Sequence, residues 1–348
     1  MEKPRIQFDR ESLITPEDMA ANMALASISA TQDEATQAAM AELGLILHSA
    51  EQRFEGDGTP ERTMRWTVEA LHKLRRKSAP SVWQALTPVA QSHPVARYFH
   101  QDPFTRWSFE KPRGYSGDAR LLDFIYQHDT IREDVNEASP IGKALYAYSK
   151  YYPSCIAVRE RRDLLAQRVD KIAEAREGGT EVLAIAAGHL REAERSQALA
   201  QGRIKRWVAL DQDPLSVGAV ARDYAGTVVE AQDGSVRGLL TDAYKLGSFD
   251  FVYSAGLYDY LTDAVAIRLN KRCMRMLKPG GTLLFANFSP ELTDDGYMET
   301  FMNWTLLLRG EDDMWNIINR SVDRNTVEAD VFFGENRNIV YGVIRKLD

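Results

Sequence analysis

Hydrophobic positions in the first half of the chain recur with the period of an α-helix. The segment 16–29 opens with a proline and places its methionines near one helical face. Thr31 and Glu34 stand at the spacing of a capping box, in which side chains and backbone satisfy free amides reciprocally. The helical pattern continues to about residue 177. We interpret residues 1–150 as an N-terminal helical cap or lid domain.

The pattern changes at residue 180 to short, continuous apolar runs of the kind that buried parallel strands show. The runs are EVLAIAA, RWVALD, GTVVEA, FDFVYS and TLLFANF, and helical stretches between them supply the crossovers that parallel strands need. The stretch 191–201 is expected to be one helix directly after the first strand. These runs predict a doubly wound α/β sheet.

Two further strand-like runs follow helical pieces at 296–308 and 311–318. TVEADVFF and NIVYGVI are joined only by GENRN, and so short a connection forces an antiparallel pair. The chain is therefore predicted to have an α/β fold, with parallel strands completed by a C-terminal antiparallel hairpin. The sheet domain is expected to span residues 151–348.

Composition and charge favour small-molecule chemistry. The 348 residues are 44% hydrophobic and include 43 Lys and Arg against 50 Asp and Glu, which gives a net charge of −7. Such a chain is poorly suited to neutralising phosphates, so we expect no nucleic-acid partner. No apolar run has the length of a membrane span, and no apolar signal region follows the first charges, so we expect neither a span nor classical secretion.

The two cysteines, Cys155 and Cys273, lie far apart and outside any C-x-x-C spacing. They predict neither a disulfide framework nor a thiolate zinc site. A reducing cytoplasm fits this usage, and we expect no metal centre.

Ligands of open α/β sheets bind beyond the carboxyl ends of the strands, where the strand order reverses. The first two turns there are AAGHLRE and ALDQDP. Gly188 would let backbone approach a ligand closely, and Asp211 would accept hydrogen bonds from both hydroxyls of a ribose. Ala186 lies in the first of these turns and Gln212 in the second, and both are further candidate cofactor-binding residues.

Four motifs, VLAIAAGHLRE, VALDQDP, FDFVYSAGLYDYL and LKPGGTLLFANFSP, resemble class I S-adenosylmethionine-dependent methyltransferases across about residues 180–348. With RGYSGDARLLDFIY and YMETFMNWTLLLRGEDDM, the chain resembles bacterial methyltransferases that make the 3-hydroxypalmitic acid methyl ester (extracellular factor) signal. The resemblance implies a Rossmann-like sheet and a cytoplasmic enzyme that uses S-adenosylmethionine. Its acceptor would be a small molecule or a fatty-acyl compound.

The resemblance also implies roles for two later turns. The turn Ser254 to Gly256 would lie under the methionine part of the cofactor. The family contacts adenine after the third strand, where this chain has Asp233, Gly234 and Ser235.

The first turn departs from the family pattern. Ala184 stands where an acid commonly orients the methionine ammonium, and Ala186 and Leu190 stand where glycines are usual. The missing acid must be replaced, by a group from the lid or by a carbonyl.

Three side chains are candidate catalytic residues. Tyr258 follows the fourth strand, although the alternative is that Tyr258 and Tyr260 pack against the helical cap. Arg113 and Tyr115 belong to the aromatic and arginine-rich segment 97–118, which we interpret as a lid that closes over the cofactor. The alternative is a satellite core or hinge between cap and sheet.

The nature of the acceptor decides which further residues matter. A carboxylate acceptor needs no general base and could be oriented by Arg113 or Arg191. A hydroxyl acceptor needs a base such as His189, Asp259 or a tyrosine.

Two other function classes remain open on the sequence alone. The depleted first turn is compatible with a protein that binds S-adenosylmethionine without methylating. A nicotinamide-dependent oxidoreductase would favour G-x-G-x-x-G, which AAGHLRE does not match.

Overall fold

A computed structural model describes residues 34–56, 58–176 and 179–347. They form two compact units, which we call the helical unit and the sheet unit. The helical unit comprises the described part of Thr15–Ile156 together with Leu292–Thr305, and the sheet unit comprises the described part of Ala157–Glu291 and Leu306–Asp348. The helix expected over 16–29 and Thr31 of the capping box lie outside the described residues.

Prolines and polar caps start most helices of the helical unit. Pro60, Pro80, Pro103 and Pro140 occupy first-turn positions, where a missing amide costs no hydrogen bond. The helices are α2 (Glu34–Glu55), α3 (Pro60–Lys77), α4 (Pro80–Ser92), α5 (Ala96–Phe99), α6 (Pro103–Glu110), α7 (Ala119–Tyr126), α8 (Arg132–Glu137), α9 (Pro140–Ser149) and α15 (Asp295–Thr300).

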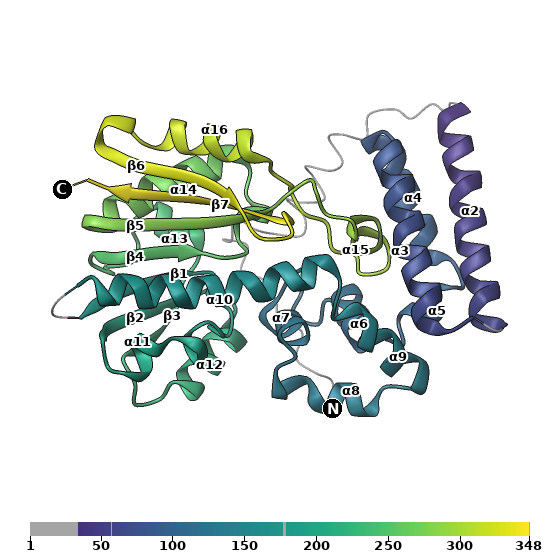
Figure 1. Ribbon diagram of the computed structural model, residues 1–348, viewed down its shortest axis with the longest axis horizontal. Coiled ribbons are helices and arrows are strands. Elements are labelled where there is room, and N and C mark those ends of the chain that lie inside the picture. The colour runs from purple at the N-terminus through teal and green to yellow at the C-terminus, as the bar shows by residue number, and fades with distance from the viewer. Residues whose placement is uncertain (1–33, 57, 177–178, 348) are drawn as a thin grey trace. The chain divides into compact units, whose positions relative to one another are not determined.

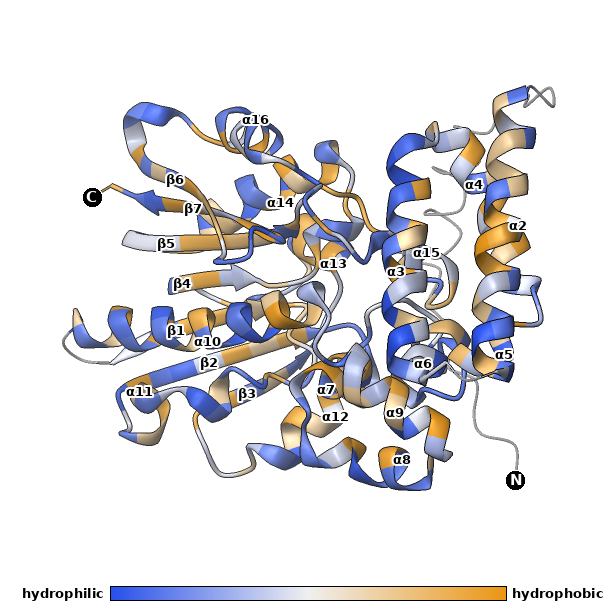
Figure 2. Ribbon diagram, turned by 45° about the vertical axis from the view of Figure 1, so that its right-hand side comes forward, coloured by the Kyte–Doolittle hydropathy of each residue, from blue (hydrophilic) through white to orange (hydrophobic). Residues whose placement is uncertain are grey.

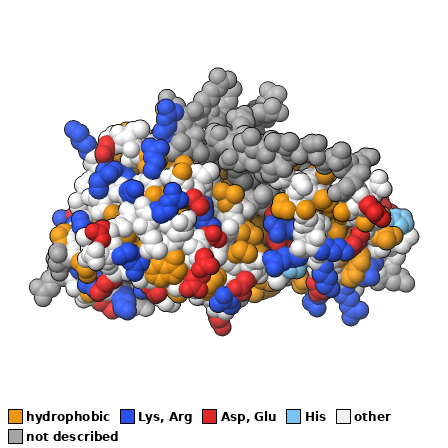
Figure 3. Space-filling model, turned by 90° about the horizontal axis from the view of Figure 1, so that it is seen from above, with side chains coloured by type: hydrophobic (Ala, Val, Ile, Leu, Met, Phe, Trp, Pro, Cys, Tyr) orange, Lys and Arg blue, Asp and Glu red, His pale blue; other side chains and the backbone are white. Residues whose placement is uncertain are grey.

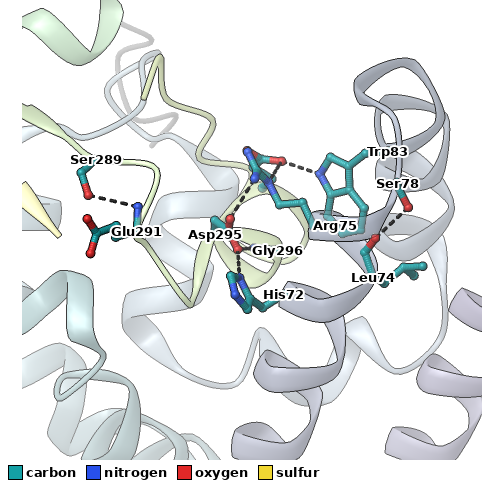
Figure 4. Close-up of polar contacts among 10 residues, drawn as sticks. His72, Leu74, Arg75, Ser78, Trp83, Ser289, Glu291, Asp295 and Gly296 are labelled. Atoms are coloured by element: carbon teal, nitrogen blue, oxygen red, sulfur yellow. Dashed lines mark hydrogen bonds and ion pairs between the residues drawn. The ribbon is translucent and has the colours of Figure 1, made fainter. Parts of the chain in front are cut away.

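A partly buried ion network joins α15 to α3, although the two helices are far apart in sequence (Figure 4). The Arg75 guanidinium donates to Asp295 at 2.8 Å and to Glu299 at 2.7 Å. His72 Nδ1 lies 2.7 Å from the other Asp295 oxygen. A Cβ on Gly296 would lie 2.6 Å from the α3 backbone, so only glycine permits this approach. These contacts make residues 292–305 part of the helical unit.

The sheet unit is built on seven strands in the order β3-β2-β1-β4-β5-β7-β6. The first five strands run parallel, and β7 is antiparallel to both β5 and β6. This confirms the predicted fold, a Rossmann-like sheet with a C-terminal antiparallel hairpin. The strands are β1 (Thr180–Ile185), β2 (Ile204–Asp211), β3 (Val229–Asp233), β4 (Phe249–Ser254), β5 (Leu277–Phe288), β6 (Val327–Phe333) and β7 (Ile339–Lys346).

Helices cover the sheet on both sides, with α10 in front of it and α14 behind it in Figure 1. The covering explains why the central strands are hydrophobic over much of their length (Figure 2). Behind the sheet, helices α13, α14 and α16 bury residues such as Leu239, Leu269 and Ile317 against the strands. The helices are α10 (Pro153–Glu174), α11 (Gln197–Ala200), α12 (Pro214–Asp223), α13 (Val236–Leu240), α14 (Asp263–Met276) and α16 (Glu311–Ser321).

Two expected helices are shorter in the structure. The stretch 191–201 forms a single 3₁₀ turn and then α11, because Ser196 acts as an N-cap, accepting from Leu199 N while its hydroxyl donates to Asp170 on α10. The helix expected over 296–308 ends with α15. Asn303 has a left-handed φ of 48°, and Trp304 N donates to Met298 O at 2.8 Å, which closes the helix end.

Candidate functional site

The turn after β1 has three left-handed residues at alternate positions. Ala186, Gly188 and Leu190 have φ values of 54°, 57° and 53°. The backbone therefore keeps the conformation that glycine would adopt freely, even though two of the three positions are not glycine. Ala186 is exposed and Leu190 is buried, so the turn presents its backbone at the start and is anchored at its end.

Asp211 links this turn to the next strand end. Its Oδ2 accepts from Gly188 N at 2.8 Å, and its Oδ1 accepts from Asp213 N at 2.8 Å. Asp211 and Gln212 begin the second turn, with Asp211 buried and Gln212 half-buried. A carboxylate oxygen has more than one acceptor site, so these bonds are compatible with ribose hydroxyls as additional donors. The chemistry of this donor and acceptor set fits the nucleoside part of S-adenosylmethionine.

The third strand ends beside the second. Asp233 is the register partner of Asp211, and Gly234 N donates to the Asp211 carbonyl at 2.9 Å. Ser235 caps α13 by accepting from Gly238 N at 3.1 Å. A Cβ on Gly234 would lie 3.1 Å from the Tyr244 ring, so this position is closely packed. Asp233 is exposed, which leaves its carboxylate accessible at this edge.

The turn after β4 lies next to the strand-order reversal between β1 and β4. Ser254 is buried, and its hydroxyl donates to the Ile185 carbonyl of β1 at 3.0 Å. Gly256 lies against Arg161 of α10, whose Nη1 donates to the Ala255 carbonyl at 2.8 Å. This turn therefore borders the crevice in which open α/β sheets bind ligands.

Tyr258 does not face this crevice. Its ring is fully buried and stacks on Phe285 at 4.6 Å between centroids, and its hydroxyl donates to Asn270 Oδ1. Burial raises the pKa of Tyr258 well above its usual value. In this arrangement the hydroxyl is not available to an acceptor, and Tyr258 packs as a core residue of the sheet unit. The catalytic role of Tyr258 stays a prediction, and this packing corresponds to the core alternative.

Arg113 and Tyr115 lie between α6 and α7 in the helical unit. Arg113 is buried, with Nε 3.7 Å from Asp118, the residue that caps α7. Burial raises the pKa of Asp118, and the Arg113 charge opposes that shift. Tyr115 is half-buried. Arg113 thus has a structural partner within its own unit, and the roles of both residues over the cofactor stay predictions.

His189 and Arg191 extend the first turn. Both are buried, and Arg191 donates to Glu194 at 2.7 Å and lies 3.4 Å from Asp223. These acidic partners occupy the guanidinium that the sequence offered as a carboxylate receptor.

Two buried acids at the strand ends stand out in the structure. Glu192 was not a sequence candidate, and it accepts a hydrogen bond from the Tyr253 hydroxyl. Asp259 accepts from Phe288 N at 2.6 Å, and burial raises its pKa to about 7 although Arg161 opposes the shift. This raised pKa is what favours Asp259 as a base, since His189 and Tyr258 are buried as well. The one sequence signal for Glu192 was its place four residues after Gly188.

In the part of the chain that the structure describes, no group of three or more His, Cys, Asp or Glu side chains could hold a metal ion. No helix in that part has both the length and the apolar character needed to cross a bilayer.

Part of the sheet unit is similar in sequence to a known protein family. Residues 185–285 match the family model described as a methyltransferase domain. A possible exported protein from Bordetella parapertussis is similar in structure, with 17% identity, a TM-score of 0.55 and coverage of 89% of this chain and 97% of that one. No curated protein matches the chain.

Two further solved structures are similar at lower TM-scores. A putative methyltransferase from Thermobifida fusca YX has 17% identity, a TM-score of 0.47 and coverage of 66% of this chain and 94% of its own. CalS10, an amino pentose methyltransferase from Micromonospora echinaspora involved in calicheamicin biosynthesis and solved with S-adenosylmethionine bound, has 16% identity, a TM-score of 0.40 and coverage of 55% and 95%.

The matched segment runs from the end of β1 into β5 and so contains the turns described above. The Bordetella structure shows that the fold extends over most of the chain. Over residues 185–285 the chain is therefore similar to a methyltransferase domain, an enzyme domain whose cofactor is S-adenosylmethionine.

Proposed function

We propose that this chain is a class I S-adenosylmethionine-dependent methyltransferase that methylates a small-molecule or fatty-acyl acceptor on a carboxylate or hydroxyl group. The observation that supports the cofactor side most directly is the bond from Gly188 N to Asp211 Oδ2, at the strand-order reversal of the sheet. The subfamily that makes 3-hydroxypalmitic acid methyl ester is the specific version of this proposal.

Bound S-adenosylmethionine would supply an electrophilic methyl group on a sulfonium. Asp211 would accept hydrogen bonds from the ribose, and the turn 186–190 would place its backbone beside the cofactor. Ser254, through its bond to Ile185, fixes the β4 turn against β1 so that the crevice keeps its shape. Asp233, Gly234 and Ser235 would border the adenine.

Charge supports a small acceptor over a nucleic acid. Lys and Arg side chains are interspersed with Asp and Glu over the face that Figure 3 shows, and the net charge is −7. Proteins that bind nucleic acids along the phosphate backbone instead have their basic side chains clustered in a stripe or patch. The two cysteines are free and buried, which supports a cytoplasmic setting.

The two acceptor chemistries place different demands on the protein. A carboxylate attacks in its ionised form and requires orientation only. A hydroxyl requires a base, and Asp259, with its pKa raised to about 7 by burial, has the proton affinity of a base at neutral pH.

The first test is Asp211→Ala, measured by calorimetry with S-adenosylhomocysteine. Losing charge-assisted bonds to the ribose should weaken binding about 10- to 150-fold, or about 1.5–3 kcal/mol. Asp223→Ala, on the surface-facing end of α12, is the control and should bind as the wild type does. An unchanged dissociation constant for Asp211→Ala would remove this residue from the ribose role.

Transfer of a labelled methyl group to candidate acids and alcohols then tests the catalytic proposal. Label incorporated into a fatty acid or hydroxy acid supports it. Tight cofactor binding without transfer to any acceptor of these classes would instead favour a non-catalytic role, which the alanine at position 184 and the strained turn leave open.

A further inference from the structure

Arg161 of α10 is a buried cation with few partners. It is 2% exposed, and its one hydrogen bond runs from Nη1 to the Ala255 carbonyl at 2.8 Å. Its Nε is buried without a hydrogen-bond partner. Within the described ranges, no carboxylate lies at salt-bridge distance from this guanidinium.

Such an arrangement is unfavourable unless an anion completes it. A guanidinium stays protonated at every physiological pH and offers five N–H donors in a planar fork that matches a carboxylate. Burying a charged side chain costs free energy when no counterion lies beside it. At a functional site, a ligand of opposite charge commonly supplies that counterion.

The surroundings of Arg161 locate that anion at the crevice. Its Nη2 would lie 3.5 Å from a Cβ on Gly256, in the turn after β4. Its guanidinium carbon lies 5.9 Å from the centroid of the Phe288 ring, at the end of β5. The donors therefore sit where two central strands end.

Two buried acids, Asp259 and Glu192, interact electrostatically with Arg161 without reaching ion-pair distance. The Asp259 carboxylate already accepts from Phe288 N, whereas Glu192 follows β1 and is 7% exposed. The Tyr253 hydroxyl donates to Glu192 Oε1, which fixes the carboxylate. A cation receptor and an anion receptor at one strand-end edge match a group that carries both charges.

We propose that Arg161 and Glu192 together bind an α-amino acid group, with Arg161 holding the carboxylate and Glu192 the ammonium. The amino acid is the methionine end of the cofactor, so this inference rests on the methyltransferase function. It gives a physical replacement for the acid that Ala184 lacks. The replacement comes from the end of the first turn and from α10, and neither the lid nor a backbone carbonyl is needed for it.

The experiment compares two ligands that differ only in this group. S-Adenosylhomocysteine carries the amino acid end, whereas 5′-methylthioadenosine keeps the nucleoside and lacks it. Calorimetry with Arg161→Met should show S-adenosylhomocysteine binding weakened about 10- to 150-fold, and methylthioadenosine binding within about twofold of the wild type. Glu192→Gln keeps an acceptor for Tyr253 and should weaken only S-adenosylhomocysteine.

Arg168→Met is the matched control, because Arg168 lies on the same helix and packs over the Phe332 ring of β6. It should leave both ligands unaffected. Thermal unfolding without ligand separates binding from structure: Arg161→Met should unfold at the wild-type temperature or above, and lose the shift that S-adenosylhomocysteine gives the wild type. If Arg161→Met is poorly folded, Arg161→Lys keeps the charge without the fork and should bind with intermediate affinity.

The outcomes are distinguishable. Equal weakening of both ligands by Arg161→Met, or no weakening of either, overturns the amino acid site and leaves the cofactor assignment intact. A wild-type protein that binds neither ligand overturns both.

Discussion

Strain in the first turn is concentrated at single residues. Ala186 and Leu190 hold left-handed φ values, which cost an L-residue roughly 1–2 kcal/mol each. Leu190 offsets this cost by being buried, with 1% of its surface exposed, whereas Ala186 is exposed. The strain at Ala186 therefore has no packing compensation, and it lies at the start of the turn that follows β1.

Ala186→Gly should stabilise the protein. Glycine relieves the left-handed strain, but it also raises the conformational entropy of the unfolded chain. We expect the balance to raise the free energy of unfolding, measured in urea, by about 0.5–1 kcal/mol. Ala187→Gly is the control, because residue 187 has no positive φ. Its free energy of unfolding should fall by about 0.5–1 kcal/mol. A loss in both variants would mean that the turn is not strained at Ala186.

At the residue scale, spacing along the chain was enough to bring Gly188 and Asp211 together, because two adjacent parallel strands must end at the same edge. It was not enough for Tyr258, since an aromatic residue after a strand suits a pocket and a core equally. Arg161 carried no recognisable signal, and the one signal for Glu192 was its place four residues after Gly188. Charged residues on a helix or in a turn are usually solvated, and only the tertiary packing shows that these two are buried.

At the scale of elements, strand order and direction were predictable because apolar runs and connection lengths determine them. The placement of α15 was not. Its residues follow β5 directly in sequence, but Asp295 and Glu299 pair with Arg75 of α3 in the helical unit. The same segment carries three side chains that are also buried in the helical unit, Met298, Met302 and Trp304. No local pattern encodes a partner more than 200 residues away.

Gly296→Ala tests this contact. The added methyl group would lie 2.6 Å from the α3 backbone, and such overpacking should destabilise the helical unit by about 1–3 kcal/mol. Gly44→Ala on α2 is the matched control, because a Cβ there meets nothing within 4 Å. In a helix interior that change should stabilise by about 0.8–1 kcal/mol. Urea unfolding of the two variants should therefore shift in opposite directions, and shifts of the same sign would refute the close approach.

At the scale of the whole molecule, each unit has its own buried core and its own buried acids. Asp102 and Asp294 belong to the helical unit, and burial raises the pKa of each to about 6. Asp259 belongs to the sheet unit, where burial raises its pKa to about 7. Between the pKa of an unfolded aspartate and these values, the folded protein binds more protons than the unfolded chain, so these three groups make stability fall as pH rises.

Asp259→Asn should remove the part of this pH-dependent loss of stability that comes from Asp259 in the sheet unit. The amide oxygen can still accept from Phe288 N, so the variant keeps the backbone bond while it abolishes the titration. From pH 4.5 to 7.5 the wild type should lose on the order of 1–3 kcal/mol relative to the variant, since each pKa unit is worth about 1.4 kcal/mol. Urea unfolding across this pH range measures the difference. If the Asp259→Asn curve runs parallel to that of the wild type throughout, the carboxyl group of Asp259 is already ionised at low pH, and it cannot act as the neutral-pH base that a hydroxyl acceptor would require.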